Sequence, residues 1–226
     1  MSDVVRAVPP GRYRFAQVAR SEVSKIVSLR SSAITLGLTV VASLLVAILV
    51  SHAQLHHTAD YYRFGFDPTQ DSLTGMIAVA LTGGVFGALL ITGEYASGTI
   101  RNTLAANPRR PLLLAGKLAV TATLAVLVCE VLSFACFLIG QAVMSGIPHA
   151  TLGSPGALRA VVMTGVFIAL LTLMAFGFGV IFRSTAAAIA AFVGVVFVLP
   201  LVMHAISEHS SRYLPTPLPL RPNGGR

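Results

Sequence analysis

The segment GEYASGTIRNTLAANPRRPLLLAGKL, residues 93–118, lies between two uninterrupted apolar runs and sets the organisation of the whole chain. It contains one acid, four bases, a Gly-Thr pair and an Asn-Pro pair. A plain connection between two packed helices needs about 2–8 residues. Residues 93–118 have room for a short helix of their own, and we call this charged segment the elbow.

The composition on both sides of the elbow is that of a membrane protein. Of 226 residues, 55% are hydrophobic and 11% are charged, whereas a soluble domain carries about 25% charged residues. A helix needs about 20 apolar residues to cross a bilayer, and the chain has five such runs, at residues 33–51, 73–92, 118–144, 161–182 and 186–203. We therefore expect an all-α, polytopic helical bundle. A single transmembrane domain is predicted over residues 12–206, after a disordered lead at 1–11 and before a proline-rich tail at 207–226.

The placement of charge predicts the orientation in the membrane. The net charge of +8 comes mostly from bases before the first run, in the elbow and between the last two runs, against only Arg63 and Arg159 in the two opposing loops. Loops rich in Lys and Arg stay in the cytoplasm. We therefore expect a multi-pass protein with a cytoplasmic N-terminus and elbow. The excess of arginine over lysine suggests the plasma membrane of a high-GC bacterium, and basicity that follows topology gives no reason to expect a nucleic-acid partner.

The order of residues within the elbow predicts a short helix with defined ends. Thr99 follows Gly98 and is a good N-cap, because its hydroxyl can accept from the free amides of the next turn. Residues 100–106 are compatible with a helix, and the Asn-Pro pair ending at Pro108 stops it. Pro111 suits the first turn of the following helix, which continues into the third span.

Two cytoplasmic segments are candidates for contact with a partner protein. In the elbow, Glu94 and Arg101 are seven positions apart, and an ion pair across the turn is predicted. Residues 12–29 form an amphipathic pattern at helical spacing, interrupted on the apolar arc by Glu22. The pattern predicts an interfacial helix lying among lipid headgroups, and its polar face can also contact a cytoplasmic partner.

Glu130 is the one charged residue inside a predicted span. An ionised carboxylate at this depth is costly, and intramembrane acids are candidates for function by default. No other predicted span supplies a base. The side chain is therefore protonated, faces a watery cavity, or bonds to a neighbour such as Ser133 or to another subunit. A role in a translocation path and a role in packing both stay open.

Small residues and histidines carry weaker signals. Gly83 and Gly87 form a G-x-x-x-G pattern, which allows close helix approach; packing within the chain is the first expectation and a dimer face the second. Cys129 and Cys136 lie two helical turns apart on one span, about 10 Å, too far for a disulfide. His52 and His56 are an i, i+4 pair in an outer loop that also carries Asp residues, but no fixed ligand spacing spans the set, so a polar loop is the first expectation and a metal site the second.

The elbow resembles the signature of type-2 ATP-binding cassette (ABC-2) permeases. In that family an acid, three residues, Gly-Thr, one residue and Arg are followed by Pro, one or two residues and Arg, and by a lysine at the next span. The matching positions here are Glu94, Gly98, Thr99, Arg101, Pro108, Arg109 and Lys117. The segment before the first span is similar to the family's E-x-x-K-x-x-x-x-R lead-in, with matches at Glu22, Lys25 and Arg30.

The resemblance covers residues 12 to about 206 and implies an exporter-type permease subunit. The N-terminal helix and the elbow, the coupling helix of the family, would dock on a separate ATPase that binds ATP and Mg²⁺, and a second permease subunit, identical or different, would help to enclose the path. This chain has no G-x-x-x-x-G-K-[ST] phosphate loop, so we expect no cofactor on it and no enzymatic activity of its own. The family has six spans, and PLPLRPNGGR at residues 217–226 stands where the sixth is expected. A shortened or frameshifted gene would explain that difference.

The function expected from these observations is transport, with ATP hydrolysis in the partner coupled through the elbow to the spans. The alternative is a membrane anchor or sensor that transports nothing and binds another cytosolic protein through the elbow. An intramembrane enzyme is disfavoured, because the spans offer Glu130 but no second acid and no histidine with which it could act. The substrate is not indicated, because the spans are apolar without a pattern.

Overall fold

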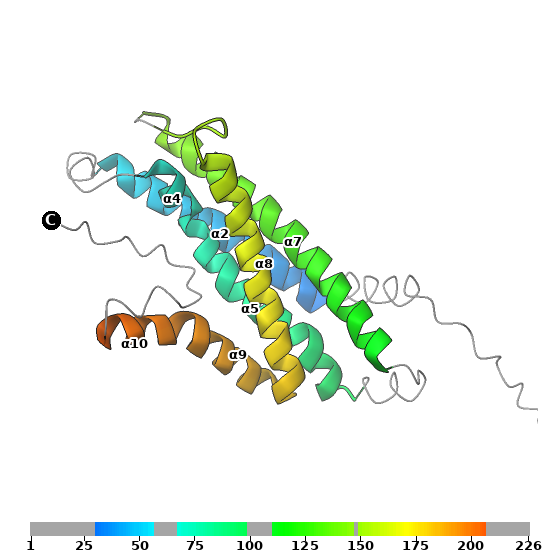
Figure 1. Cartoon of the computed structure of the whole chain (residues 1–226). Coiled ribbons are helices and arrows are strands. Elements are labelled where there is room, and N and C mark those ends of the chain that lie inside the picture. The colour runs from blue at the N-terminus through cyan, green and yellow to red at the C-terminus, as the bar shows by residue number, and fades with distance from the viewer. Residues whose placement is uncertain (1–29, 57–66, 99–109, 147–148, 207–226) are drawn as a thin grey trace, which may run out of the picture.

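The computed structural model describes residues 30–56, 67–98, 110–146 and 149–206, and every regular element in these ranges is a helix (Figure 1). Five helical segments are long and apolar enough to cross a membrane: Ile34–Ala53, Pro68–Ala96, Ala115–Gly146, Ala157–Phe182 and Thr185–Met203. The expected fold class and the five spans are confirmed. In lipid the helix is the way for a single segment to satisfy its own backbone hydrogen bonds, so hydropathy alone was sufficient for this prediction.

The helices extend beyond the apolar runs, because their polar ends also continue the backbone ladder. Pro111 is the second residue of α7, as expected of proline in a first turn. The elements and their bounds are α2 Arg30–His56, α4 Pro68–Ser72, the 3₁₀ turn η1 Leu73–Gly75, α5 Met76–Ala96, α7 Arg110–Val143, the 3₁₀ turn η2 Met144–Gly146, α8 Ala157–Phe182, α9 Thr185–Val193, the π-helical turn η3 Gly194–Val198 and α10 Leu199–Ile206.

Four long helices form an antiparallel bundle, and the last span leans away from it (Figure 1). We call the end of the bundle where α5 stops and α7 starts the elbow end, and the opposite end, where α4 lies, the far end. In an 18-residue stretch of each span, 44% of residues are buried in those of α5 and α8, against 22% in those of α2 and α9. Helices α5 and α8 therefore form the centre, and among the described long helices α9 contacts mainly this pair.

Glycines bring the two central helices together. A Cβ on Gly83 would lie 2.8 Å from Thr172 Oγ1 of α8, and one on Gly87 would clash with the backbone oxygen of Thr172. A Cβ on Gly84 would collide with the ring of Phe192 in α9. The G-x-x-x-G pattern therefore serves packing within the chain, as expected.

A buried glutamine holds the far end closed. Gln141 of α7 donates from Nε2 to Pro68 O and to Ser72 Oγ, both at 2.8 Å, and its Oε1 accepts from the Ala150 amide at 2.8 Å. These bonds join α4, α7 and the segment before α8. The amide of Gln141 is only 7% exposed, so the bonds are protected from competing water.

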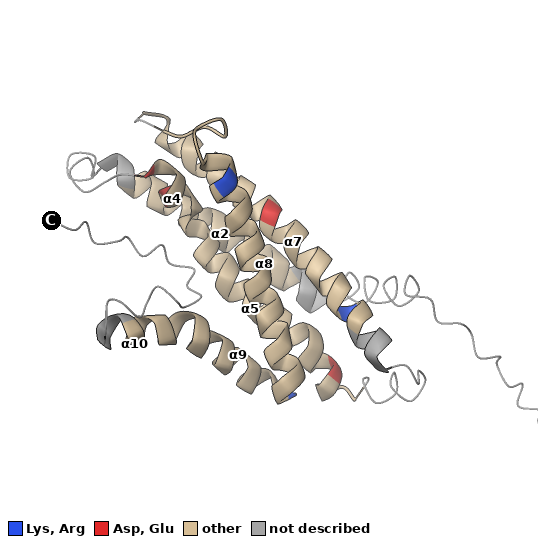
Figure 2. Ribbon diagram, in the orientation of Figure 1, with Lys and Arg blue, Asp and Glu red and all other residues tan. Residues whose placement is uncertain are grey.

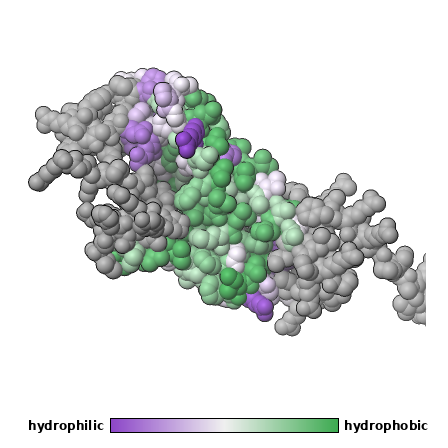
Figure 3. Space-filling model, in the orientation of Figure 1, coloured by the Kyte–Doolittle hydropathy of each residue, from purple (hydrophilic) through white to green (hydrophobic). Residues whose placement is uncertain are grey.

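Apolar side chains cover the outside of the bundle between its two ends. Along α2, large side chains at helical spacing are more than half exposed: Ile34, Leu38, Val41, Leu45 and Leu49. Figure 2 places the described charged residues near the ends, apart from Glu130, and Figure 3 shows an apolar surface between a polar far end and a small polar patch at the elbow end. This distribution fits a bundle surrounded by lipid.

Candidate functional site

The elbow end of α5 is closed by a glycine in a conformation that other residues avoid. Helix α5 ends at Ala96, its C-cap Ser97 bonds back to Gly93 O, and Gly98 has φ +68. A left-handed residue just past a helix end is the common way to stop a helix and turn the chain. Gly98, expected at the turn between helix and elbow, lies there.

An ion pair joins the two helices that flank the elbow. Lys117 Nζ lies 2.6 Å from Glu94 Oε1, and the two side chains are 8% and 14% exposed. Glu94 is in the last turn of α5 and Lys117 is two turns inside α7. Removing one partner from a pair this well shielded leaves a buried charge, at a cost of about 3–5 kcal/mol. The pair therefore fixes the distance between the two ends from which the elbow starts and finishes.

The same turn of α5 also contacts the junction between α8 and α9. Thr185 of α9 donates from Oγ1 to Thr92 Oγ1 of α5 at 2.8 Å. The guanidinium of Arg183, in the turn between α8 and α9, lies 5.8 Å from the ring centroid of Tyr95, a cation–π contact. One turn of α5 is thus connected to α7 on one side and to α8 and α9 on the other.

Most of the sequence-derived elbow residues lie outside the described residues. This holds for Thr99, Arg101, Pro108 and Arg109, and for the short helix and the Glu94–Arg101 ion pair predicted there. It also holds for Glu22, for Lys25 and for the predicted amphipathic helix that contains both. Arg30 is the first residue of α2. The roles of all these residues stay predictions.

The elbow contacts that the structure reveals had an incomplete signal in the sequence. Lys117 belongs to the motif that resembles the ABC-2 signature, but its partner was not predicted, because nothing in the local pattern relates positions 94 and 117. Arg183 was noted only as a charge that reports topology. Thr92, Tyr95 and Thr185 carried no signal, since single hydroxyls and rings at helix ends are common.

Glu130 faces α8 rather than another charged group. Its Oε1 is buried and accepts no hydrogen bond from the described residues. A Cβ on Gly165 would lie 2.7 Å from Glu130 Cδ, so the carboxyl group fills the space that this glycine leaves open. Ser133, an expected partner, instead donates to Val161 O at 2.7 Å. The structure therefore favours contact with the neighbouring helix, and it leaves the role in a translocation path untested.

Nothing in the described ranges indicates covalent or metal chemistry. Cys129 and Cys136 are both free and buried, in agreement with their expected apolar role. Among the residues that the structure describes, no three of His, Cys, Asp and Glu lie close enough together to hold a metal ion. The contacts described above converge on the last turn of α5. They can transmit a displacement from one helix to the next and exclude water.

Five described helices of bilayer length, with a shielded ion pair across one charged connection, define a multi-pass helical membrane protein. A search of curated proteins and of solved structures found no significant match. A family model described as ABC-2 family transporter protein matches residues 20–203. The chain belongs to this family and is a transmembrane permease component. The resemblance drawn from the elbow motif is confirmed.

Proposed function

We propose that this chain is the membrane subunit of an ATP-driven exporter, and that the elbow transmits movement from a separate ATPase to the helices. The observation that carries the proposal is the Glu94–Lys117 ion pair at 2.6 Å. It ties both ends of the elbow to each other, so a force on the elbow displaces α5 and α7 together. The elbow end is then cytoplasmic, in the plasma membrane of a bacterium.

Further support comes from the contacts that continue from this turn of α5 into the bundle. Thr92 bonds to Thr185, and Tyr95 meets Arg183. Because α5 and α8 pack through glycines with little space between them, they move as one unit. A shift of the elbow by the ATPase would therefore be transmitted to α8 and α9 through these contacts as well as through the backbone of the elbow.

The remaining parts of the transporter lie on other polypeptides. The ATPase supplies ATP and Mg²⁺ binding, and residues 12–29 and the elbow are the surfaces offered to it. A second permease subunit, identical or different, completes the path, for which the exposed apolar side chains of the bundle provide area. An anchor or sensor that binds a different cytosolic protein is the alternative function, and no described contact favours it.

The test is co-purification with the ATPase encoded beside this chain. The tagged chain is expressed as wild type, as Glu94→Lys, as Lys117→Glu and as the exchanged double variant. We expect the wild type to retain the ATPase in detergent, each single variant to lose most of it, and the double variant to recover a substantial part. Each variant is first checked for a single symmetrical peak in size-exclusion chromatography.

Arg159→Glu is the charge-reversal control, because it also reverses one charge but does so on an exposed side chain at the far end, in the first turn of α8. It should retain the ATPase as the wild type does. Equal retention by all five proteins would show that the ion pair is not part of the coupling surface. Capture of a kinase or another regulator in place of an ATPase would favour the anchor or sensor.

A further inference from the structure

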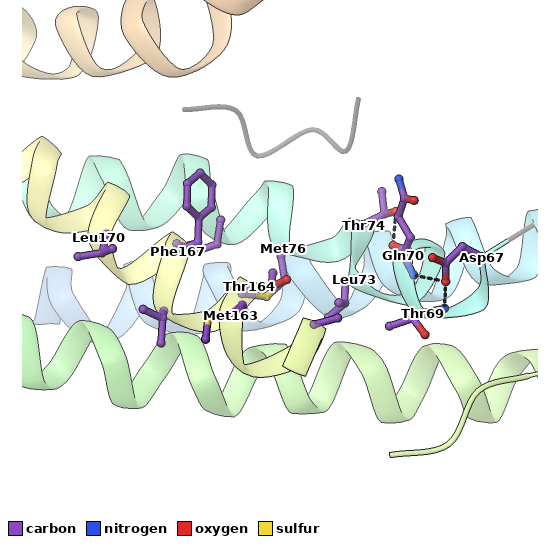
Figure 4. Close-up of a pocket in the computed structure, with 13 residues that line it drawn as sticks. Asp67, Thr69, Gln70, Leu73, Thr74, Met76, Met163, Thr164, Phe167 and Leu170 are labelled. Atoms are coloured by element: carbon purple, nitrogen blue, oxygen red, sulfur yellow. Dashed lines mark hydrogen bonds between the residues drawn. The ribbon is translucent and has the colours of Figure 1, made fainter. Parts of the chain in front are cut away.

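A groove of about 680 Å³ runs between the far-end part of the second span and α8 (Figure 4). Its volume is within the range of about 300–1,000 Å³ that is usual for small-molecule sites. It has no part in the ion-paired elbow end, which lies at the other end of the same helices. The groove is open on one side, so a molecule in the surrounding membrane can enter from there.

The lining changes from polar to apolar along the groove. Asp67, Gln70 and Thr74 lie at one end, where α4 and η1 begin the span, and Phe167 and Leu170 lie at the other, on α8 (Figure 4). The stretch of α8 that lines it extends over eleven residues, from Ala160 to Leu170, about 15 Å of helix. A ligand that fits both ends has one polar head and one extended apolar chain.

The charge at the polar end is negative. Among the described residues that line the groove, Asp67 is the only charged one, and it is exposed. It is held in place as the N-cap of α4, with Oδ1 accepting from the amides of Thr69 at 2.9 Å and Gln70 at 3.3 Å. Arg159 of α8 is also exposed at this end of the bundle but is not part of the lining. The head that complements this end is therefore a cation.

We propose that this groove binds a single-chain cationic amphiphile, with its head at Asp67 and its chain along Phe167 and Leu170 towards the middle of the membrane. If the transport function proposed above holds, single-chain cationic amphiphiles are the molecules that the subunit transports, and this part of the inference rests on that function. The binding itself requires no ATPase. A failure of binding and a failure of coupling are therefore separate results.

The chain contains no tryptophan, so a single introduced tryptophan reports on one place. Phe167→Trp puts the reporter in the groove, and Leu127→Trp puts it on the outside of α7, where Leu127 is 60% exposed. The full chain is placed in lipid nanodiscs with brominated dodecyl probes that differ only in the head: trimethylammonium, phosphocholine or sulfate. Bromine quenches tryptophan on contact, and the reporter at 127 corrects for partition of each probe into the lipid.

We expect the trimethylammonium probe to quench the groove reporter at about two- to fivefold lower concentration than the other two, the range of one solvent-accessible charge pair. The Asp67→Asn substitution should remove this preference while it preserves the helix, since asparagine caps as well as aspartate. Equal quenching by all heads would overturn the proposal in favour of ordinary lipid contact. A preference for sulfate or phosphocholine would also overturn it, because the positive charge of Arg159 rather than Asp67 would then select the head group. A groove reporter shielded from every probe would overturn it because a second copy or another segment then covers the groove.

Discussion

Replacing Gly87 by alanine should destabilise the bundle, although alanine is the better helix former. The new Cβ would clash with the backbone oxygen of Thr172 and would lie 3.2 Å from its Cγ2. A backbone atom cannot rotate away, so α5 and α8 have to separate, and such overpacking costs about 1–3 kcal/mol. Alanine returns about 0.5–1 kcal/mol of helix propensity. The net loss is about 0–2.5 kcal/mol, with a central value of about 1 kcal/mol.

Gly93→Ala is the matched control, because it lies on the same helix and its Cβ would meet nothing within 4 Å. It should gain about 0.5–1 kcal/mol from propensity alone. The free energy of unfolding of both variants is measured by titrating sodium dodecyl sulfate into the protein in mild detergent and following helicity by circular dichroism. If Gly87→Ala is as stable as Gly93→Ala, the close approach of α5 and α8 does not exist and the path from the elbow to α8 loses its basis.

Two further predictions concern buried polar groups. Gln141→Leu should lower the free energy of unfolding by about 1–3 kcal/mol, because it leaves the buried Ala150 amide without its hydrogen bond, whereas Ser72 Oγ and Pro68 O keep their bond to each other; the same titration measures this, and an unchanged midpoint would mean that water replaces the glutamine. Gly165→Ala should cost about 1 kcal/mol in the wild type and less than about 0.5 kcal/mol on a Glu130→Ala background, because the colliding carboxyl group is then gone. Equal costs on the two backgrounds would contradict the contact.

The number of spans could be predicted from the sequence because the bilayer permits few alternatives. Pro111 at the beginning of α7 and the left-handed Gly98 after α5 follow from backbone geometry alone. The close packing of Gly83 and Gly87 was also predicted, since small residues at this spacing are useful only where another helix approaches. In each case a local pattern and its physical cause lie within a few residues of each other.

The contacts between helices could not be predicted in the same way. In a soluble helix the apolar face marks the core, but here lipid and protein interior are both apolar, so an apolar face does not mark the core: along α2 the large aliphatic side chains are exposed, and small side chains such as Ser43 and Ala47 are buried. Nothing local relates Glu94 to Lys117, or Glu130 to Gly165. These pairs depend on the relative rotation and height of two helices, and that follows from the packing of the whole bundle.

The turn between α8 and α9 has a consequence for how the chain is synthesised. Only Arg183 and Ser184 separate the two helices, and Arg183 has φ 53, which costs a residue with a Cβ about 1–2 kcal/mol. So short a connection holds the end of α8 next to the start of α9, so the two helices can enter the bilayer together as a hairpin. With the elbow end in the cytoplasm, as proposed above, Arg183 anchors the tip of this hairpin on the cytoplasmic side, and a glycine in its place would ease the turn but remove the anchor.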